Sequence, residues 1–298
     1  MKLEGIFPAL ITPFDEETAR PEWLLKILEK FNTLPLSGYV FLGSTGETAH
    51  LSDRERLWLL REVLPAVPGE KLKIVGCMFH ALKPALDFLE DGARMGAQAA
   101  LVLTPHYFRH QMHAEQLVAF YRQLADRAPV PILVYHFPAV TGISLSTETL
   151  LMLSEHPNII GCKDSAGDLA LQQGVLGRCR QSFSLLTGSA ATLYPSLLCG
   201  AAGGILALAN LLPEACLRLY QLVQNEQWEQ ARSLQQRLIP LNRLVTRTYG
   251  LGGLKYAMQQ LGYQAGNPRA PLSLPDARGQ ATIDRELKQV SDLANTFQ

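Results

Sequence analysis

The chain of 298 residues is 47% hydrophobic and carries 27 basic and 27 acidic side chains, so its formal net charge is zero. This balance does not favour nucleic acid or an anionic membrane surface as a partner, and no apolar run reaches the roughly 20 residues of a membrane span. The five cysteines form no C-x-x-C pair and the N-terminus has no signal-peptide pattern, so we expect a cytoplasmic protein with buried thiols and no disulfide framework.

Eight short apolar runs recur along the chain, and each is hydrophobic almost throughout. They cover residues 5–12, 38–43, 72–78, 99–105, 131–137, 158–163, 183–188 and 203–209. Continuous hydrophobicity of this kind is typical of strands that are covered on both faces of a parallel sheet. Helical patterns lie between the runs, including PEWLLKILEKF (21–31) and SDRERLWLLREVL (52–64). In the second of these, Ser52 and Glu55 have the spacing of a capping box.

The alternation predicts an α/β fold, a (β/α)8 TIM barrel over residues 1–210 whose eighth helix continues to about residue 225. A doubly wound open sheet is the alternative, but no G-x-G-x-x-G follows the first run. From residue 226 to residue 298 the pattern becomes helical. This predicts a C-terminal helical segment and not a separate catalytic domain.

Chemically useful residues follow several of the expected strands, and in such a barrel the catalytic groups lie at the carboxyl ends of the strands. Lys163 ends the run NIIGCK. In an apolar setting its amine would be neutral often enough to attack a carbonyl and form a Schiff base. The alternative is a surface lysine paired with Asp164. Tyr135 ends the neighbouring run, and it could carry protons for this chemistry or be an ordinary rim tyrosine.

The loop GSTGE (43–47) follows the second expected strand. Its two hydroxyls, its glycines and its backbone N–H groups are suited to holding a carboxylate. The same sequence also fits a simple loop before a helix, because Thr48 or Ser52 could cap a helix start.

GSTGE, YHFPAVTG and GCKDSAGD, in this order and at these spacings, resemble the dihydrodipicolinate synthase / N-acetylneuraminate lyase superfamily. GIFPALITPF near the N-terminus and the later GSAAT and GAAGGILALAN also fit, so the resemblance covers essentially the whole chain. It implies a class I lyase that uses no external cofactor and forms an imine with pyruvate or a related 2-oxo acid. In that chemistry Lys163 would be the imine lysine and Tyr135 the phenol that transfers protons.

The resemblance also implies roles for other residues. Ser44 and Thr45 stand where the family binds the pyruvyl carboxylate, and Gly188 and Ile205 fall at backbone positions that line the pocket. Tyr107 would enter the tyrosine relay from across a dimer interface, joined to the catalytic phenol through Ser44. This implies a homodimer or homotetramer.

The departures from the family pattern bear on the substrate. Dihydrodipicolinate synthases carry an arginine, in a Y-N-x-P-x-R-T-G pattern, that holds the carboxylate of aspartate semialdehyde, and Val140 stands in its place here. KDSAGD and the C-terminal stretch around GLKYAMQQLGY are more similar to aldolases acting on 4-hydroxy-2-oxoglutarate or on 2-keto-3-deoxy sugar acids. We therefore expect an aldolase of this kind that releases pyruvate. Dihydrodipicolinate synthase, which joins pyruvate to aspartate semialdehyde, is the alternative, and a 2-oxo-acid-binding sensor is the non-enzyme alternative.

Two residues near the expected site have open or unknown roles. Ser165 is a candidate for contacting the distal polar end of the substrate, or for capping the helix that begins near Asp168. His136 replaces the asparagine that is usual in the family, and the sequence indicates no role for it.

A run of histidines could be mistaken for a metal site. His106, His110 and His113 would share one face of a helix, as metal ligands can. No carboxylate lies within the run, however, and the chemistry that the resemblance implies needs no metal. We therefore expect no metal site there.

Overall fold

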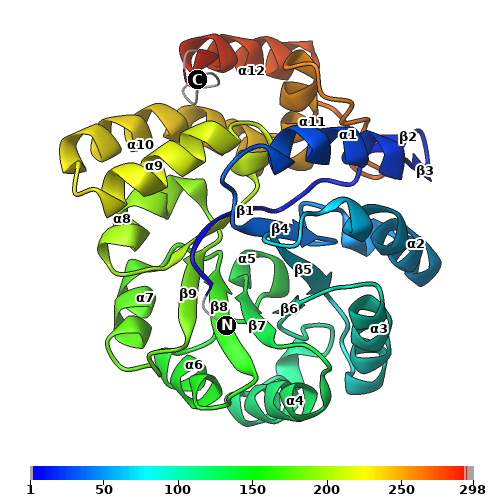
Figure 1. Ribbon diagram of the computed structural model, residues 1–298, viewed down its shortest axis with the longest axis vertical. Coiled ribbons are helices and arrows are strands. Elements are labelled where there is room, and N and C mark those ends of the chain that lie inside the picture. Colours follow the sequence, from blue (N-terminus) through cyan, green and yellow to red (C-terminus); the bar gives the residue numbers. More distant parts are fainter. Residues whose placement is uncertain (1–2, 292, 294–298) are drawn as a thin grey trace.

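A parallel barrel forms the centre of the computed structural model, which describes residues 3–291 and 293 (Figure 1). In these residues its eight strands are β1 (Gly5–Pro8), β4 (Gly38–Phe41), β5 (Leu72–Cys77), β6 (Ala99–Leu103), β7 (Ile132–His136), β8 (Ile159–Asp164), β9 (Ser184–Thr187) and β10 (Gly203–Leu206). They pair in the order β1-β10-β9-β8-β7-β6-β5-β4. A parallel bridge between Ala9 and Val40 closes the barrel. Each strand lies within an expected apolar run or extends it by one residue, and the (β/α)8 prediction is confirmed.

Helices surround the barrel on its outer face (Figure 1). They are α1 (Pro21–Asn32), α2 (Asp53–Val63), α3 (Leu82–Arg94), α4 (Ala114–Arg127), α6 (Thr147–Ser154), α7 (Leu169–Leu176), α8 (Leu193–Leu198) and α9 (Pro213–Gln224). The capping box of α2 is confirmed, since the Ser52 hydroxyl accepts from the Glu55 N–H and the Glu55 carboxylate accepts from the Ser52 N–H. Two small additions are the antiparallel pair β2 (Phe14–Asp15) and β3 (Thr18–Ala19) and the one-turn helix α5 (Pro138–Thr141).

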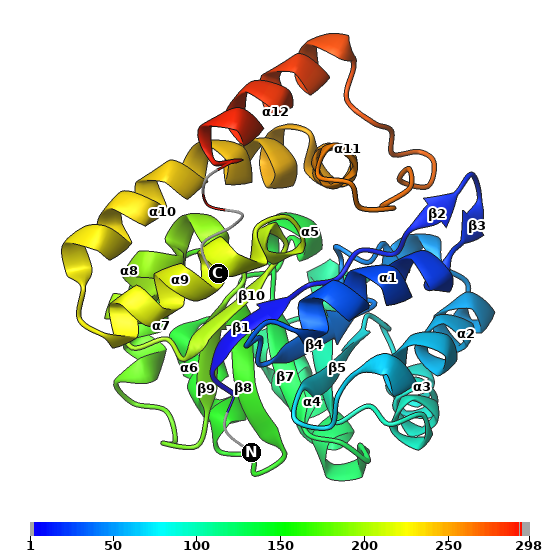
Figure 2. The same ribbon diagram turned by 45° about the horizontal axis from the view of Figure 1, so that its top comes forward.

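The C-terminal helices form a group at one side of the barrel, at the top of Figure 2. They are α10 (Trp228–Arg243), the π-helical turn η6 (Leu244–Thr248), α11 (Gly250–Gln260) and α12 (Ala277–Gln289). Gln235 of α10 joins this group to the barrel, because its amide donates to the Ala190 carbonyl and accepts from the Tyr194 N–H, both at 2.9 Å. The division near residue 225 stays a prediction; it falls between α9 and α10. Residues 292 and 294–298 of the predicted segment lie outside the described residues.

Alternate residues of the strands face two separate apolar cores, as the two-residue period of a strand requires. The inner core fills the barrel and includes Phe7, Ile74, Leu133 and Tyr135. The outer core packs the strands against the helices. Among the described residues, no helix is long and apolar enough to cross a membrane.

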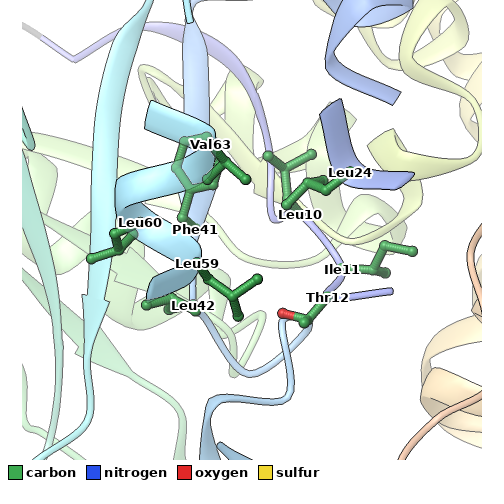
Figure 3. Close-up of a pocket in the computed structure, with 9 residues that line it drawn as sticks. All are labelled: Leu10, Ile11, Thr12, Leu24, Phe41, Leu42, Leu59, Leu60 and Val63. Atoms are coloured by element: carbon green, nitrogen blue, oxygen red, sulfur yellow. The ribbon is translucent and has the colours of Figure 1, made fainter. Parts of the chain in front are cut away.

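One small void remains in the outer core, between the segment after β1, strand β4 and helices α1 and α2 (Figure 3). Its lining is apolar except for Thr12, whose hydroxyl donates to the Gly46 carbonyl at 2.7 Å. The volume of about 10 Å³ is no more than one water molecule needs. This void is a packing defect and cannot hold a substrate.

Candidate active site

Lys163 lies near the carboxyl end of β8, and its side chain is only 5% exposed. It faces Tyr135 in the register of β7 and β8, and its Nζ is 4.2 Å from the centre of the tyrosine ring. In the part of the chain that the structure describes, no carboxylate lies within salt-bridge distance of this amine. Within that part the amine therefore has an aromatic neighbour but no ionic partner, and it is available to a ligand.

Asp164 faces the opposite side of β8 and does not pair with Lys163. Its carboxylate accepts from His136 Nδ1 at 3.0 Å and from Gln172 Nε2 at 2.8 Å. His136 Nε2 accepts from the Leu145 N–H at 3.2 Å, so Nδ1 carries the proton that is donated to Asp164. Burial alone would raise the pKa of Asp164, but the hydrogen bonds outweigh it and the pKa is lowered. The alternative that Lys163 is a surface lysine paired with Asp164 is therefore wrong. His136, for which the sequence indicated no role, donates a hydrogen bond that holds Asp164.

Gly188 lies directly beside Lys163, just after β9. A Cβ atom at this position would come within 3.0 Å of Lys163 Cε and within 1.9 Å of Ser165 Oγ. The Gly188 N–H also donates to the Asp164 carbonyl at 2.6 Å. A side chain at residue 188 would displace the lysine or the serine, so glycine is required by the geometry of its neighbours.

The GSTGE loop follows β4, and two residues with left-handed backbone lie at its ends. Leu42 and Glu47 each have a φ of 54°, which costs a residue other than glycine about 1–3 kcal/mol. Glu47 is held by a fully buried ion pair with Lys255 of α11, 2.5 Å between Oε1 and Nζ. Its Oε2 also accepts from the Arg269 N–H at 2.9 Å. Contacts with the C-terminal segment therefore hold the loop in this conformation.

A cavity of about 630 Å³ opens at this end of the barrel, a volume suited to small metabolites. Six of the eight predicted site residues line it: Lys163, Tyr135, Ser44, Thr45, Ser165 and Gly188. Asn242, Thr246 and Arg247 line it as well. The sequence analysis missed these three because they belong to a helical segment far from any strand end. No local motif marks them.

The other two predicted residues lie outside the cavity. Tyr107 is 75% exposed, and its ring contacts those of Phe108 and His80 at centroid distances of 5.0 and 6.2 Å. Its role across a dimer interface stays a prediction. Ile205 is fully buried on β10 in the inner core.

Ser165 does not cap the helix that follows it. The N-cap of α7 is Asp168, whose carboxylate accepts from the Leu171 N–H at 3.0 Å. The capping alternative is therefore wrong. The Ser165 side chain lines the cavity, where a distal substrate group could contact it.

The histidine run does not share one helix face, so that expectation is wrong. The short 3-10 helix η3 (Arg109–Gln111) interrupts it, and His113 is the N-cap of α4. Within the described ranges, no group of three or more His, Cys, Asp or Glu is arranged to hold a metal ion.

Comparisons with known proteins identify the family of the chain. The model of the dihydrodipicolinate synthetase family matches residues 2–290. The chain belongs to this family. It is 33% identical over 285 residues to the 4-hydroxy-tetrahydrodipicolinate synthase of Ruegeria pomeroyi, a match that covers 96% of this chain and 98% of the relative.

Two solved structures match over almost their whole length. The 4-hydroxy-tetrahydrodipicolinate synthase of Methylacidiphilum fumariolicum is 25% identical with a TM-score of 0.91, covering 98% of this chain and 97% of its own. The dihydrodipicolinate synthase of Acinetobacter baumannii, complexed with pyruvate, is 25% identical with a TM-score of 0.91, covering 97% and 99%. The family resemblance drawn from the motifs is confirmed.

Membership identifies the protein as a carbon–carbon lyase of the Schiff-base-forming kind. The names of the relatives favour the dihydrodipicolinate synthase alternative over the 4-hydroxy-2-oxoglutarate or sugar-acid aldolase that the sequence motifs led us to expect first. They give the sensor alternative no support.

Proposed function

We propose that the protein condenses pyruvate with aspartate semialdehyde to form 4-hydroxy-tetrahydrodipicolinate, using Lys163 as the imine-forming residue. The observation that carries this proposal is the position of the Lys163 amine, which is buried, has no carboxylate partner among residues 3–291 and 293, and lies 4.2 Å from the Tyr135 ring centre. Ser44 and Thr45 line the same cavity and supply hydroxyls for the pyruvyl carboxylate. The names of the relatives and the pyruvate complex of the A. baumannii enzyme support the choice of substrates.

The chemistry follows from these groups. The Lys163 Nζ attacks C2 of pyruvate through its lone pair, and the Tyr135 hydroxyl gives a proton to the departing oxygen, so water leaves and an imine forms. Loss of a proton from C3 gives an enamine. Its C3 then bonds to the aldehyde carbon of the acceptor, whose oxygen takes up a proton. Hydrolysis or transimination of the product imine returns the free amine.

A second candidate is the cleavage of 4-hydroxy-2-oxoglutarate or of a 2-keto-3-deoxy sugar acid with release of pyruvate. Val140 favours it, since this residue is 52% exposed and lines the cavity where the synthase pattern has an arginine. Both candidates use the same imine, so they differ only in the group on the far side of the bond.

The proposal includes no external cofactor, a cytoplasmic location, and a homodimer or homotetramer in which Tyr107 from a second copy completes the proton relay. Its exposed ring is suited to an interface between copies. Sedimentation as a monomer at assay concentration would contradict this part of the proposal.

The test compares wild type, Lys163→Ala and, as a control, Lys83→Ala, an exposed lysine on α3. We expect wild type and the control to consume pyruvate in the presence of aspartate semialdehyde, and Lys163→Ala to show none of this turnover. Pyruvate release from 4-hydroxy-2-oxoglutarate or 2-keto-3-deoxygluconate, with no condensation, would instead establish the second candidate. Normal turnover by Lys163→Ala would overturn both.

A further inference from the structure

Arg247 comes from the C-terminal segment but faces the active-site cavity. It belongs to the π-helical turn η6 and lines the same cavity as Lys163. Single π-helical turns are frequently found at functional sites, because the inserted residue changes where neighbouring side chains point. Arg247 therefore lies on the side of the cavity formed by the C-terminal segment, across from the residues that the barrel strands supply.

The charge of the cavity is unbalanced. Among the described residues that line it, Lys163 and Arg247 are the only charged ones, and none is acidic. The Arg247 side chain is exposed and has no hydrogen bond or ion pair with another described residue. Two cations with no anion favour a substrate that carries negative charge at two separate places.

Other arginines near the mouth are already engaged. The guanidinium of Arg269 is held by Glu55 at 2.6 Å, and that of Arg56 by Asp53 at 2.7 Å and by the Thr48 carbonyl at 2.8 Å. In contrast, none of the described residues engages the donors of the Arg247 guanidinium. A planar guanidinium can bind a carboxylate through two parallel hydrogen bonds, which a valine at residue 140 cannot do.

We infer that Arg247 is a specificity-determining residue that binds the distal carboxylate of the acceptor, taking the place of the arginine that Val140 replaces. The inference rests on the proposed function, because it assumes that pyruvate is bound as an imine at Lys163. It narrows the acceptor to an aldehyde that carries a carboxylate. Aspartate semialdehyde and glyoxylate, the fragment of 4-hydroxy-2-oxoglutarate, both meet this requirement, whereas an uncharged sugar aldehyde does not.

The experiment uses wild type, Arg247→Met, Arg247→Lys and the control Arg243→Met, an exposed arginine at the end of α10 that does not line the cavity. Each is assayed for condensation of pyruvate with aspartate semialdehyde and with butanal, which lacks the carboxylate, and for trapping of the pyruvate imine by borohydride. For Arg247→Met we expect kcat/KM with aspartate semialdehyde to fall about 10- to 100-fold. Butanal turnover and imine trapping should stay within about threefold, and Arg247→Lys should recover part of the loss.

The outcomes separate the two proposals. If borohydride traps no pyruvate imine on wild type, both the proposed function and the role of Arg247 are overturned. If wild type traps the imine but Arg247→Met handles aspartate semialdehyde like the Arg243→Met control, the role of Arg247 is overturned while the proposed function stands. An equal loss with both aldehydes would show a structural effect, and would also overturn the inference.

Discussion

Two buried lysines of this protein have opposite surroundings. Lys163, inside the barrel mouth, lies over the Tyr135 ring and has no carboxylate partner among the described residues. Lys255, in α11, lies over the Phe14 ring at 4.5 Å but forms a 2.5 Å ion pair with Glu47 and donates to the Asn267 carbonyl at 3.0 Å. Burial alone therefore does not make a nucleophile, because a lysine whose charge is neutralised within the protein has no need of a ligand.

The largest expected difference between the two lysines is chemical. Wild type treated with pyruvate and borohydride should carry the reduced adduct on the peptide that contains Lys163 and not on the one that contains Lys255. Lys163→Met should lose turnover by at least about a thousandfold, because no other described residue that lines the cavity carries an amine that could form the imine. Mass spectrometry of the digested protein makes the measurement. An adduct on Lys255 would show that both buried lysines react with pyruvate, and would contradict the prediction.

Of the two lysines, only the role of Lys163 could be predicted from the sequence. Lys163 could be identified because an apolar strand ends at it, and strand ends gather at the barrel mouth. Lys255 lies in GLKYAM with no acidic neighbour, and its partner Glu47 is far away in the chain. The alternation of apolar runs predicts the barrel for the same reason that it predicts Lys163: both depend on local pattern. Three features could not be predicted in this way, because they depend on which distant segments of the chain meet. They are the Glu47–Lys255 ion pair, the position of Arg247 in the cavity and the His136–Asp164 hydrogen bond.

Replacing Lys255 should have a structural effect. Lys255→Met leaves the Glu47 carboxylate buried without its partner, so we expect the free energy of unfolding to fall by about 3–5 kcal/mol. Urea unfolding measures this. The matched double variant Glu47→Gln/Lys255→Met removes both charges and should be less destabilised than the sum of the single variants. A single variant within about 1 kcal/mol of wild type would mean that the ion pair does not hold the loop.

His136, on the neighbouring strand β7, sharpens the comparison, because it holds the Asp164 carboxylate on the side of β8 opposite to Lys163. His136→Phe removes a hydrogen bond to a buried carboxylate and should destabilise the protein by about 2–3 kcal/mol. His136→Asn retains a donor and should lose less. Thermal unfolding compares the two variants. Equal losses would mean that the volume of the ring matters and not the donated hydrogen bond.

The smallest effect on stability is expected at Glu55, which forms an ion pair with Arg269. Arg269 lies over the Phe14 ring, as Lys255 does. The hydrogen bond from Arg269, helped by contacts with Ser52, lowers the pKa of Glu55 to about 2. Because the pKa is lower in the folded state, the ionised carboxylate stabilises the fold above its ordinary pKa of about 4.5, and this contribution is lost as the pH falls towards 2.

Glu55→Gln should therefore lower the unfolding free energy at neutral pH by no more than about 1 kcal/mol, since the pair is partly open to solvent. The deficit should shrink as the pH falls below about 4.5 and should vanish only at about pH 2 and below, which urea titrations at neutral pH and at about pH 2 measure. A deficit that is equal at both would assign the effect to the capping box of α2, whose backbone contacts glutamine can partly keep, and not to the charge on Glu55. The ion pair would then contribute nothing to the loop, and the buried Glu47–Lys255 pair would hold it unaided.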